Sequence, residues 1–325
     1  MPGVRRVVLG ALVLLVLALS AAVWWLHWGS QSRRDRALAR YLEEKAAYTT
    51  ASTELTGMVP RRLSESSGVA VSRTYPGVLW THNDSGHDPV VFAMNLDGQI
   101  LGAFSVQGAE SRDWEDISLG RCPGVWSSES DCLYIGDIGD NLRRRSVYSL
   151  YIIPEPNPTS VEPTATTTVA EVRRVDFVYP DERHDAEAMA VSPDGNVTIV
   201  TKGRNGRTQL FVIHHAVVEQ AIRQNRAITP ESRGTLAIDP VPLIGKVVTG
   251  AAFSPSGRIL AVRTYTEIYL YTVGEDGELL PPAVPCFVGI IEPGGEAVDF
   301  LDEETLVLTS EWSRGQQGTI YRVRC

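Results

Sequence analysis

The sequence Leu133-Tyr134-Ile135-Gly136-Asp137-Ile138-Gly139-Asp140-Asn141 reads as a short apolar strand followed by a turn with two carboxylates and an amide. A glycine stands directly before each aspartate, and glycine lets the backbone bend tightly. Hard cations such as calcium take about six to eight oxygen ligands, which carboxylates and a turn backbone can supply. Gly-Asp and Asp-Asn pairs are also ordinary turn chemistry. The stretch becomes informative because related strands and turns recur along the chain.

Five segments of the chain resemble one another. Each begins with a short strand of small and apolar residues, and a more apolar strand follows it. The first strands begin at Ser67-Gly68-Val69-Ala70, Glu115-Asp116-Ile117-Ser118, Glu187-Ala188-Met189-Ala190, Gly250-Ala251-Ala252-Phe253 and Glu296-Ala297-Val298-Asp299. Short strands, turn signals and a period of roughly 45–70 residues predict an all-β fold, a β-propeller of four-stranded blades.

Counting the repeats favours five blades, although a sixth could lie within the long second or third repeat. The last repeat ends at its third strand, so we expect residues 56–63 to supply its outer strand. This pairing would join the two ends of the chain and leave no open edge. The helical spacing of residues 215–228 predicts a helix inserted in the third blade.

In such a ring, the link into each innermost strand and the link from the second to the third strand open on one face. Most acidic motifs of the chain occur in these links, so we expect them to converge on one rim. A dense group of like charges is costly unless a cation neutralises it, and an all-oxygen donor set favours calcium. The predicted metal ligands are Asp84, Glu115, Asp137, Asp140, Asn141, Glu187 and Glu296.

Two alternatives remain open at this stage. Glu115, Glu187 and Glu296 could instead accept hydrogen bonds from neighbouring backbone N–H groups and so connect adjacent blades, because buried polar groups need partners. The basic residues of the same rim are Lys202, Arg204 and Arg263. They could balance the carboxylates, or they could act as catalytic groups that hold an anionic substrate.

Several motifs resemble bacterial extracytoplasmic propellers of the phytase-like and esterase-like kind, and more distantly gluconolactonase-type propellers. They are Glu65-Ser66-Ser67-Gly68, Leu79-Trp80-Thr81-His82-Asn83-Asp84-Ser85-Gly86, Asp113-Trp114-Glu115-Asp116, Tyr134 to Asn141 and Asp185-Ala186-Glu187-Ala188-Met189. The resemblance covers about residues 60–325. It implies calcium held by carboxylates at the channel mouth, with a phosphate ester bound over it. This chain departs from the pattern at Thr249-Gly250-Ala251, where an acid would be expected.

The charge of the body also limits its partners. The chain carries a formal charge of −9, and residues 46–325 alone carry −13 from 23 basic and 36 acidic residues. Phosphate binding needs a basic footprint, so we expect no nucleic-acid partner. We expect a monomer.

Four cysteines indicate an oxidising compartment, although four cysteines allow three pairings. Cys122 and Cys132 bracket a polar loop and fit a disulfide across a hairpin tip, which leaves Cys286 and Cys325 as the other pair. No C-x-x-C spacing is present, which argues against zinc and thioredoxin-type sites.

The N-terminus carries an uncharged apolar run over residues 7–26, long enough at 1.5 Å per residue to span about 30 Å of bilayer. We expect an uncleaved transmembrane anchor over residues 1–28, a stalk over residues 29–50 and the propeller over residues 51–325. The alternative is a signal peptide cleaved near Ala18-Leu19-Ser20, which would give a secreted protein. In either case the propeller would lie outside the cytoplasm.

Two functions follow from these observations. The first is a membrane-anchored, calcium-binding propeller that hydrolyses phosphate esters or lactones. The second is a non-catalytic module in which the cation stiffens the ring and the acidic face binds a protein or a glycan.

Overall fold

The computed structural model describes residues 51–325, except residues 125, 127–130, 161 and 242–244, and also residues 20, 29, 31, 32, 35–41, 43 and 45. The chain divides into two compact units, Met1–Ala47 and Tyr48–Cys325. The described residues of the first unit are helical. Among the described residues, no helix is both long and apolar enough to cross a membrane. The predicted span over residues 7–26 and its alternative cleavage site lie, apart from Ser20, outside the described residues.

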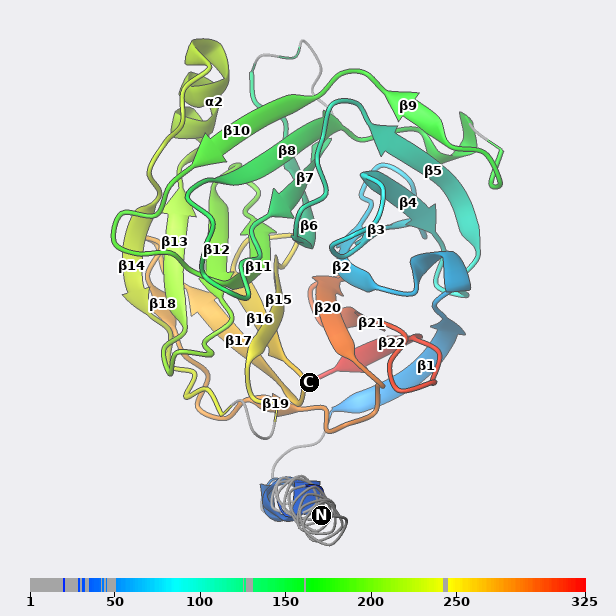
Figure 1. Ribbon diagram of the computed structural model, residues 1–325, viewed down its shortest axis with the longest axis vertical. Coiled ribbons are helices and arrows are strands. Elements are labelled where there is room, and N and C mark those ends of the chain that lie inside the picture. Colours follow the sequence, from blue (N-terminus) through cyan, green and yellow to red (C-terminus); the bar gives the residue numbers. More distant parts are fainter. Residues whose placement is uncertain are drawn as a thin grey trace, which may run out of the picture. The chain divides into compact units, whose positions relative to one another are not determined.

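Residues 51–325 form a five-bladed β-propeller, which confirms the predicted fold and the favoured blade count (Figure 1). The strands of each blade, from the innermost outward, are as follows. Blade 1 has β2 (Ser66–Val71), β3 (Leu79–Asn83), β4 (Val90–Met94) and β5 (Ile100–Val106); blade 2 has β6 (Trp114–Arg121), β7 (Asp131–Asp137), β8 (Tyr148–Pro154) and β10 (Arg173–Phe177); blade 3 has β11 (Ala186–Val191), β12 (Val197–Thr201), β13 (Gln209–Ile213) and β14 (Glu231–Thr235); blade 4 has β15 (Val248–Phe253), β16 (Ile259–Thr264), β17 (Glu267–Val273) and β18 (Leu279–Leu280); blade 5 has β20 (Gly295–Phe300), β21 (Thr305–Ser310), β22 (Thr319–Arg324) and β1 (Ser52–Met58).

The ring closes in the way the sequence predicts, because β1 pairs antiparallel with β22. The predicted bounds of this strand, residues 56–63, were wrong, because they lie too far along the chain. The pairing runs from Ser52 to Met58, and a short 3₁₀ helix (Arg61–Leu63) follows. Pro60 lies between them and has no backbone N–H to donate to a ladder, so it ends the strand.

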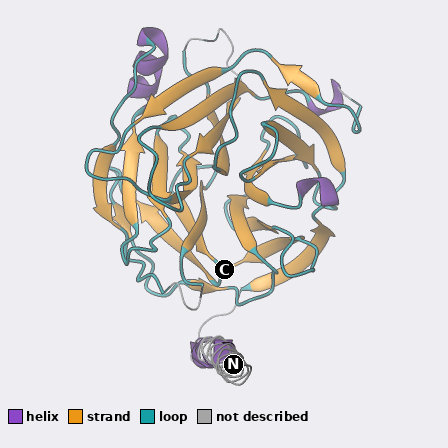
Figure 2. Ribbon diagram, viewed as in Figure 1, coloured by secondary structure: helices purple, strands orange, loops and turns teal. Residues whose placement is uncertain are grey.

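Two blades carry an additional strand, and one carries a helix. β9 (Thr167–Val169) pairs parallel with β5 at the edge of blade 1, and β19 (Cys286–Phe287) pairs with β17 in blade 4. The predicted helix is confirmed as α2 (His215–Gln224), which lies at the periphery of the ring (Figure 2). Its buried residues Val218 and Ala221 belong to a hydrophobic cluster that blades 2 and 3 share.

All five innermost strands contain a β-bulge, and every bulge occurs near the start of its strand. The residues that these register shifts leave without a partner on the neighbouring strand include Glu115, Glu187, Thr249 and Glu296. In blade 1 the shift lies between Ser66 and Val69. A bulge leaves one residue outside the ladder and re-aims its side chain. The glutamates identified in the sequence therefore occupy the positions at which each blade departs from regular pairing.

The apolar core consists of clusters between successive blades, such as the one around Trp80 and Trp114 that blades 1 and 2 share. Both disulfides form as predicted, Cys122–Cys132 and Cys286–Cys325. The second disulfide ties the end of the chain to β19.

Candidate functional site

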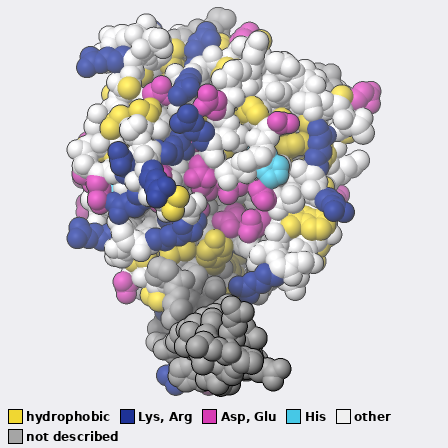
Figure 3. Space-filling model, in the orientation of Figure 1, with side chains coloured by type: hydrophobic (Ala, Val, Ile, Leu, Met, Phe, Trp, Pro, Cys, Tyr) yellow, Lys and Arg dark blue, Asp and Glu magenta, His cyan; other side chains and the backbone are white. Residues whose placement is uncertain are grey.

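A cavity of 210 Å³ lies where the bulged ends of the innermost strands meet; we call it the channel mouth. Its lining side chains are all polar: Glu65, Ser66, Ser67, Asp84, Glu115, Asn141, Glu187, Lys202, Arg204, Tyr265, Glu296 and Glu311. Six carboxyl groups face two cationic groups there, which gives a formal charge of −4 when all are ionised. Figure 3 shows Asp and Glu side chains gathered near the middle of this face, with Lys and Arg side chains beside them. The predicted convergence of the acids is present, although not every predicted residue takes part.

Three carboxyl groups at one side of the channel mouth lie close enough to share one cation. Asp84, Asp113 and Glu115 each place an oxygen within 4.8 Å of the others. Asp84 comes from the β3–β4 link, Asp113 from the link into β6, and Glu115 from the bulge of β6. In the described part of the chain, no hydrogen bond or ion pair occupies the carboxylates of Asp113 and Glu115, although Glu115 is only 3% exposed.

The backbone is shaped around this group as well. A Cβ atom on Gly139 would overlap the carboxylate oxygens of both Asp113 and Glu115. The glycine therefore allows the two carboxyl groups to lie directly against the backbone of the turn. An all-oxygen donor set with a buried, unpartnered carboxylate fits a hard divalent cation such as calcium.

The other side of the channel mouth holds its own cation, the side chain of Lys202. Its ammonium group forms an ion pair with Glu187. The backbone N–H of Lys202 donates to the carbonyl of Asp185 at 2.9 Å, which holds the residue at the start of its loop. Tyr265 donates its hydroxyl to Glu296 at 3.3 Å. This side is therefore partly neutralised, whereas the group of Asp84, Asp113 and Glu115 has no lysine or arginine bound to it among the described residues.

Burial and mutual repulsion raise the pKa values of these acids. Burial, followed by the charge of Glu187, raises the pKa of Glu296 to about 8. Burial raises the pKa of Glu187 to about 7, with Lys202 acting in the opposite direction. For Asp113, burial and then the neighbouring Asp84 raise the pKa to about 6. Burial and Glu187 raise the pKa of Glu115 well above its usual range. Glu296, Glu187 and Asp113 therefore exchange protons near neutral pH.

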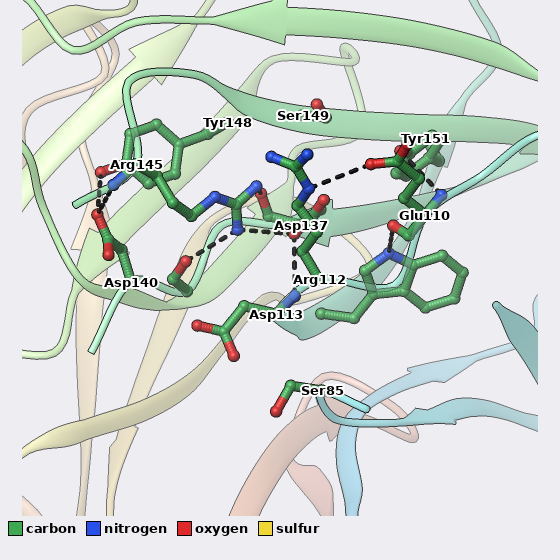
Figure 4. A network of polar contacts seen from close by, with 12 residues as sticks. Ser85, Glu110, Arg112, Asp113, Asp137, Asp140, Arg145, Tyr148, Ser149 and Tyr151 are labelled. Carbon is green, nitrogen blue, oxygen red and sulfur yellow. Dashed lines mark hydrogen bonds and ion pairs between the residues drawn. The ribbon is translucent and has the colours of Figure 1, made fainter. Parts of the chain in front are cut away.

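Two predicted ligands do not line the channel mouth. Asp137 is 2% exposed, and its carboxylate accepts hydrogen bonds from the Arg145 guanidinium at 2.7 Å and from the Asp113 N–H at 3.1 Å (Figure 4). Asp140 accepts from the backbone N–H groups of Arg144 and Arg145 and from the Tyr148 hydroxyl at 3.1 Å. Both carboxylates are thus occupied by the chain itself, and they shape the turn that carries the site.

Among the predicted basic residues, Lys202 and Arg204 line the channel mouth and Arg263 does not. Arg263 was expected on the rim, but its guanidinium is fully buried. It pairs with Glu292 and donates to the carbonyls of Ala297 and Thr309. Because these partners belong to blade 5 and the link before it, Arg263 joins blades 4 and 5. Arg204 is exposed and bonds Asn141 and Asp185, which explains the position of Asn141 at the edge of the cavity.

Acidic residues other than the three predicted glutamates connect the blades through hydrogen bonds to backbone N–H groups. Asp116 accepts backbone N–H groups of Met189 in blade 3 and Ala251 in blade 4. Asp299 accepts the N–H of Val71 at 2.6 Å, across the junction of blades 5 and 1. No such backbone bond to the carboxylates of Glu115, Glu187 or Glu296 is found in the described residues. Glu187 pairs instead with Lys202, and Glu296 accepts the Tyr265 hydroxyl, which leaves Glu115 as the one of the three without a side-chain partner among the described residues.

Sequence reasoning missed two contributors. Asp113 stands in the motif Asp113-Trp114-Glu115-Asp116 but was not among the predicted ligands, because its proximity to Asp84 joins two blades. The second is Arg145, which no sequence motif singles out. Its position five residues after Asp140, in the run Arg143-Arg144-Arg145, was the available signal that a cation would neutralise the turn.

No family model matches this chain, and no curated protein matches its sequence. Solved structures with a similar arrangement include the PQQ-bound aldose sugar dehydrogenase of Streptomyces coelicolor, with a TM-score of 0.44 at 11% identity over 85% of this chain and 99% of that chain. A candidate glucose dehydrogenase of Thermus thermophilus matches with a TM-score of 0.44 at 10% identity, over 84% and 99% of the two chains. A candidate gluconolactonase matches with a TM-score of 0.40 at 12% identity, over 84% and 92%. Likenesses of this size assign no activity to the chain, and the predicted phytase-like family is not confirmed.

Proposed function

We propose that the channel mouth binds a divalent cation, calcium in the first instance, and that the protein hydrolyses a small polyhydroxylated lactone or ester there. The observation that carries the proposal is the group of Asp84, Asp113 and Glu115, whose oxygens lie within 4.8 Å of one another. Two of the three, Asp84 and Glu115, line the polar channel mouth. A bound cation would supply polarisation of the carbonyl group of the substrate.

The protein's own groups supply the remaining chemistry. Glu296 is the candidate general base, because its raised pKa of about 8 makes its ionised form a strong base for an attacking water. Since that form becomes the major one only above about pH 8, turnover should rise with pH up to that value. Tyr265 holds this carboxyl group through its hydroxyl. Lys202 carries the positive charge that would stabilise negative charge developing on the carbonyl oxygen.

Charge favours lactones and esters over phosphate esters. Six carboxyl groups against two cationic groups would repel a multiply charged phosphate, even with one divalent cation present. The same groups are good hydrogen-bond acceptors and donors for sugar hydroxyls. A phosphate ester is therefore the second candidate substrate.

The test combines metal binding with turnover. Protein stripped with EDTA should bind calcium in a titration calorimeter and should hydrolyse sugar-acid lactones or aryl esters only when the cation is restored. Asp84→Asn should lose most of the calcium affinity and the activity, whereas Asp88→Asn, an exposed residue of the same link, should keep both. Calcium binding without turnover on lactones, esters or aryl phosphates would favour the non-catalytic binding module. Absence of divalent-cation binding would refute the proposal.

Membrane anchoring and a location outside the cytoplasm also remain proposals. The two disulfides support an oxidising compartment. The uncharged apolar run over residues 7–26 supports the anchor. Fractionation of cells that express the full chain, with protease added from outside, tests both.

A further inference from the structure

A second pocket, of 620 Å³, lies beside the channel mouth. We call it the arginine pocket, after the residues Arg143, Arg145 and Arg183 that line it together with Tyr148, Val178 and Tyr179. It lies between the β7–β8 link and the link that leads into β11. Among the groups proposed to act in hydrolysis, none belongs to this pocket.

Three arginines and two carboxylates line the arginine pocket, which gives its lining a formal charge of +1. Asp181 and Glu182 also line the pocket, but Asp181 bonds the His184 ring at 2.8 Å and Glu182 pairs with Arg143 at 2.8 Å. Arg145 pairs with Asp137. The guanidinium of Arg183 is exposed and has no ion pair among the described residues. Among the three lining arginines, Arg183 alone has no carboxylate partner in the described part of the chain, so it is the group that would attract an anion.

Two buried donors of the same pocket lack partners. Within the described part of the chain, neither Nε of Arg145 nor the hydroxyl of Tyr179 makes a hydrogen bond. Tyr179 is 5% exposed, and the side chain of Arg145 is 14% exposed. A buried donor without an acceptor is costly, and native proteins contain few of them. Two such donors on the walls of one pocket indicate that the ligand supplies the acceptor.

The arginine pocket is physically joined to the channel mouth. Arg145 lines the pocket and bonds one oxygen of Asp137, and the same oxygen accepts the N–H of Asp113 (Figure 4). Asp113 in turn belongs to the proposed cation group. A ligand that spans the two sites would therefore contact neighbouring parts of one polar network.

We propose that the arginine pocket binds an oxyanion group, a carboxylate or a phosphate, with the adjoining carbon skeleton against Tyr148, Tyr179 and Val178. Resting on the proposed function, this assigns the substrate a negative group at the end remote from the hydrolysed bond. The walls suit such a ligand because arginine pairs with oxyanions in a planar fork and the tyrosines offer apolar surface.

The experiment measures anion binding separately from hydrolysis. The EDTA-treated full chain is titrated at low salt with phenyl phosphate, benzoate and the neutral analogue benzyl alcohol. We expect saturable binding of at least one anion and none of the alcohol, with the preferred anion distinguishing a phosphate from a carboxylate site. Arg183→Gln should weaken that binding at least fivefold, because the unpaired guanidinium is lost.

The matched control is Arg73→Gln, another exposed arginine, which lines a different pocket between blades 5 and 1. It should leave anion binding unchanged. Equal binding of the neutral analogue, equal effects of the two variants, or no saturable anion binding would each overturn the inference. Asp84→Asn separates the two proposals: it should lose most of the calcium affinity and the turnover while anion binding persists. Hydrolysis of neutral lactones without anion binding would refute this inference alone.

Discussion

Lys202 provides the sharpest test of the electrostatics of the channel mouth. Its side chain is buried, is paired with Glu187, and interacts favourably with the charges of Glu115 and Glu296. Lys202→Met removes this cation while approximately keeping its volume. The carboxylates of the cavity then repel one another without the positive charge of Lys202 to offset them.

The magnitude follows from the burial of the pair. Removing one partner of a buried ion pair costs about 3–5 kcal/mol, because the remaining charge is left uncompensated. For a domain of this size, each kcal/mol lowers Tm by roughly 2–4 °C. We therefore expect Tm to fall by about 6–20 °C at about pH 8, where Glu187 is largely ionised. At about pH 5 the loss should be smaller, because Glu187 takes up a proton.

The assay is thermal and urea unfolding of four proteins in EDTA: the unmodified chain, Lys202→Met, Glu187→Gln and the double variant. The double variant should regain most of the lost stability, which gives a coupling free energy above about 1 kcal/mol. Added calcium should stabilise Lys202→Met more than the unmodified chain, because the cation then relieves more repulsion. Additive effects of the two single substitutions, with coupling below about 0.5 kcal/mol, would refute this account of the cavity.

Three further predictions concern the site and the ring. Gly139→Ala should weaken calcium binding about tenfold in a calorimetric titration, because its methyl group would displace the carboxylate of Glu115. The far-ultraviolet circular dichroism spectrum should be unchanged. An unchanged calcium affinity would contradict the role given to this glycine. The folded pKa values of Glu187 and Glu296, about 7 and about 8, exceed their unfolded values of 4.5, so their contribution to stability is complete below about pH 4.5 and is lost as the pH rises to about 8. Melting in EDTA should show Tm falling across this window, saturating calcium should flatten the fall, and a Tm that is flat without calcium would contradict the raised pKa values. Asp116→Asn should lower the free energy of unfolding by about 1–3 kcal/mol, since an amide cannot accept all the backbone N–H groups that the carboxylate accepts. Urea unfolding measures this change in free energy. An unchanged free energy of unfolding would show that Asp116 does not hold the blades together.

The sequence alone was sufficient for the architecture, because the information is local. Alternation of apolar residues and turn chemistry such as Ser192-Pro193-Asp194-Gly195 define each hairpin, and repetition of the hairpins implies a ring. The missing fourth strand of the last repeat also predicted closure by the N-terminal strand. For the same reason the bracketed loop between Cys122 and Cys132 predicted its disulfide.

Only the tertiary structure decided which acids form the site. Asp137 and Asp140 look like ligands in the sequence, but Arg145 and the turn's own N–H groups take up their oxygens. Arg263 reads as a rim residue, yet it is buried against Glu292. The composition of a turn specifies which donors and acceptors exist, whereas the choice among partners depends on distances between blades. The five bulges of the innermost strands set those distances, and no local pattern of residue types specifies where a ladder loses its register.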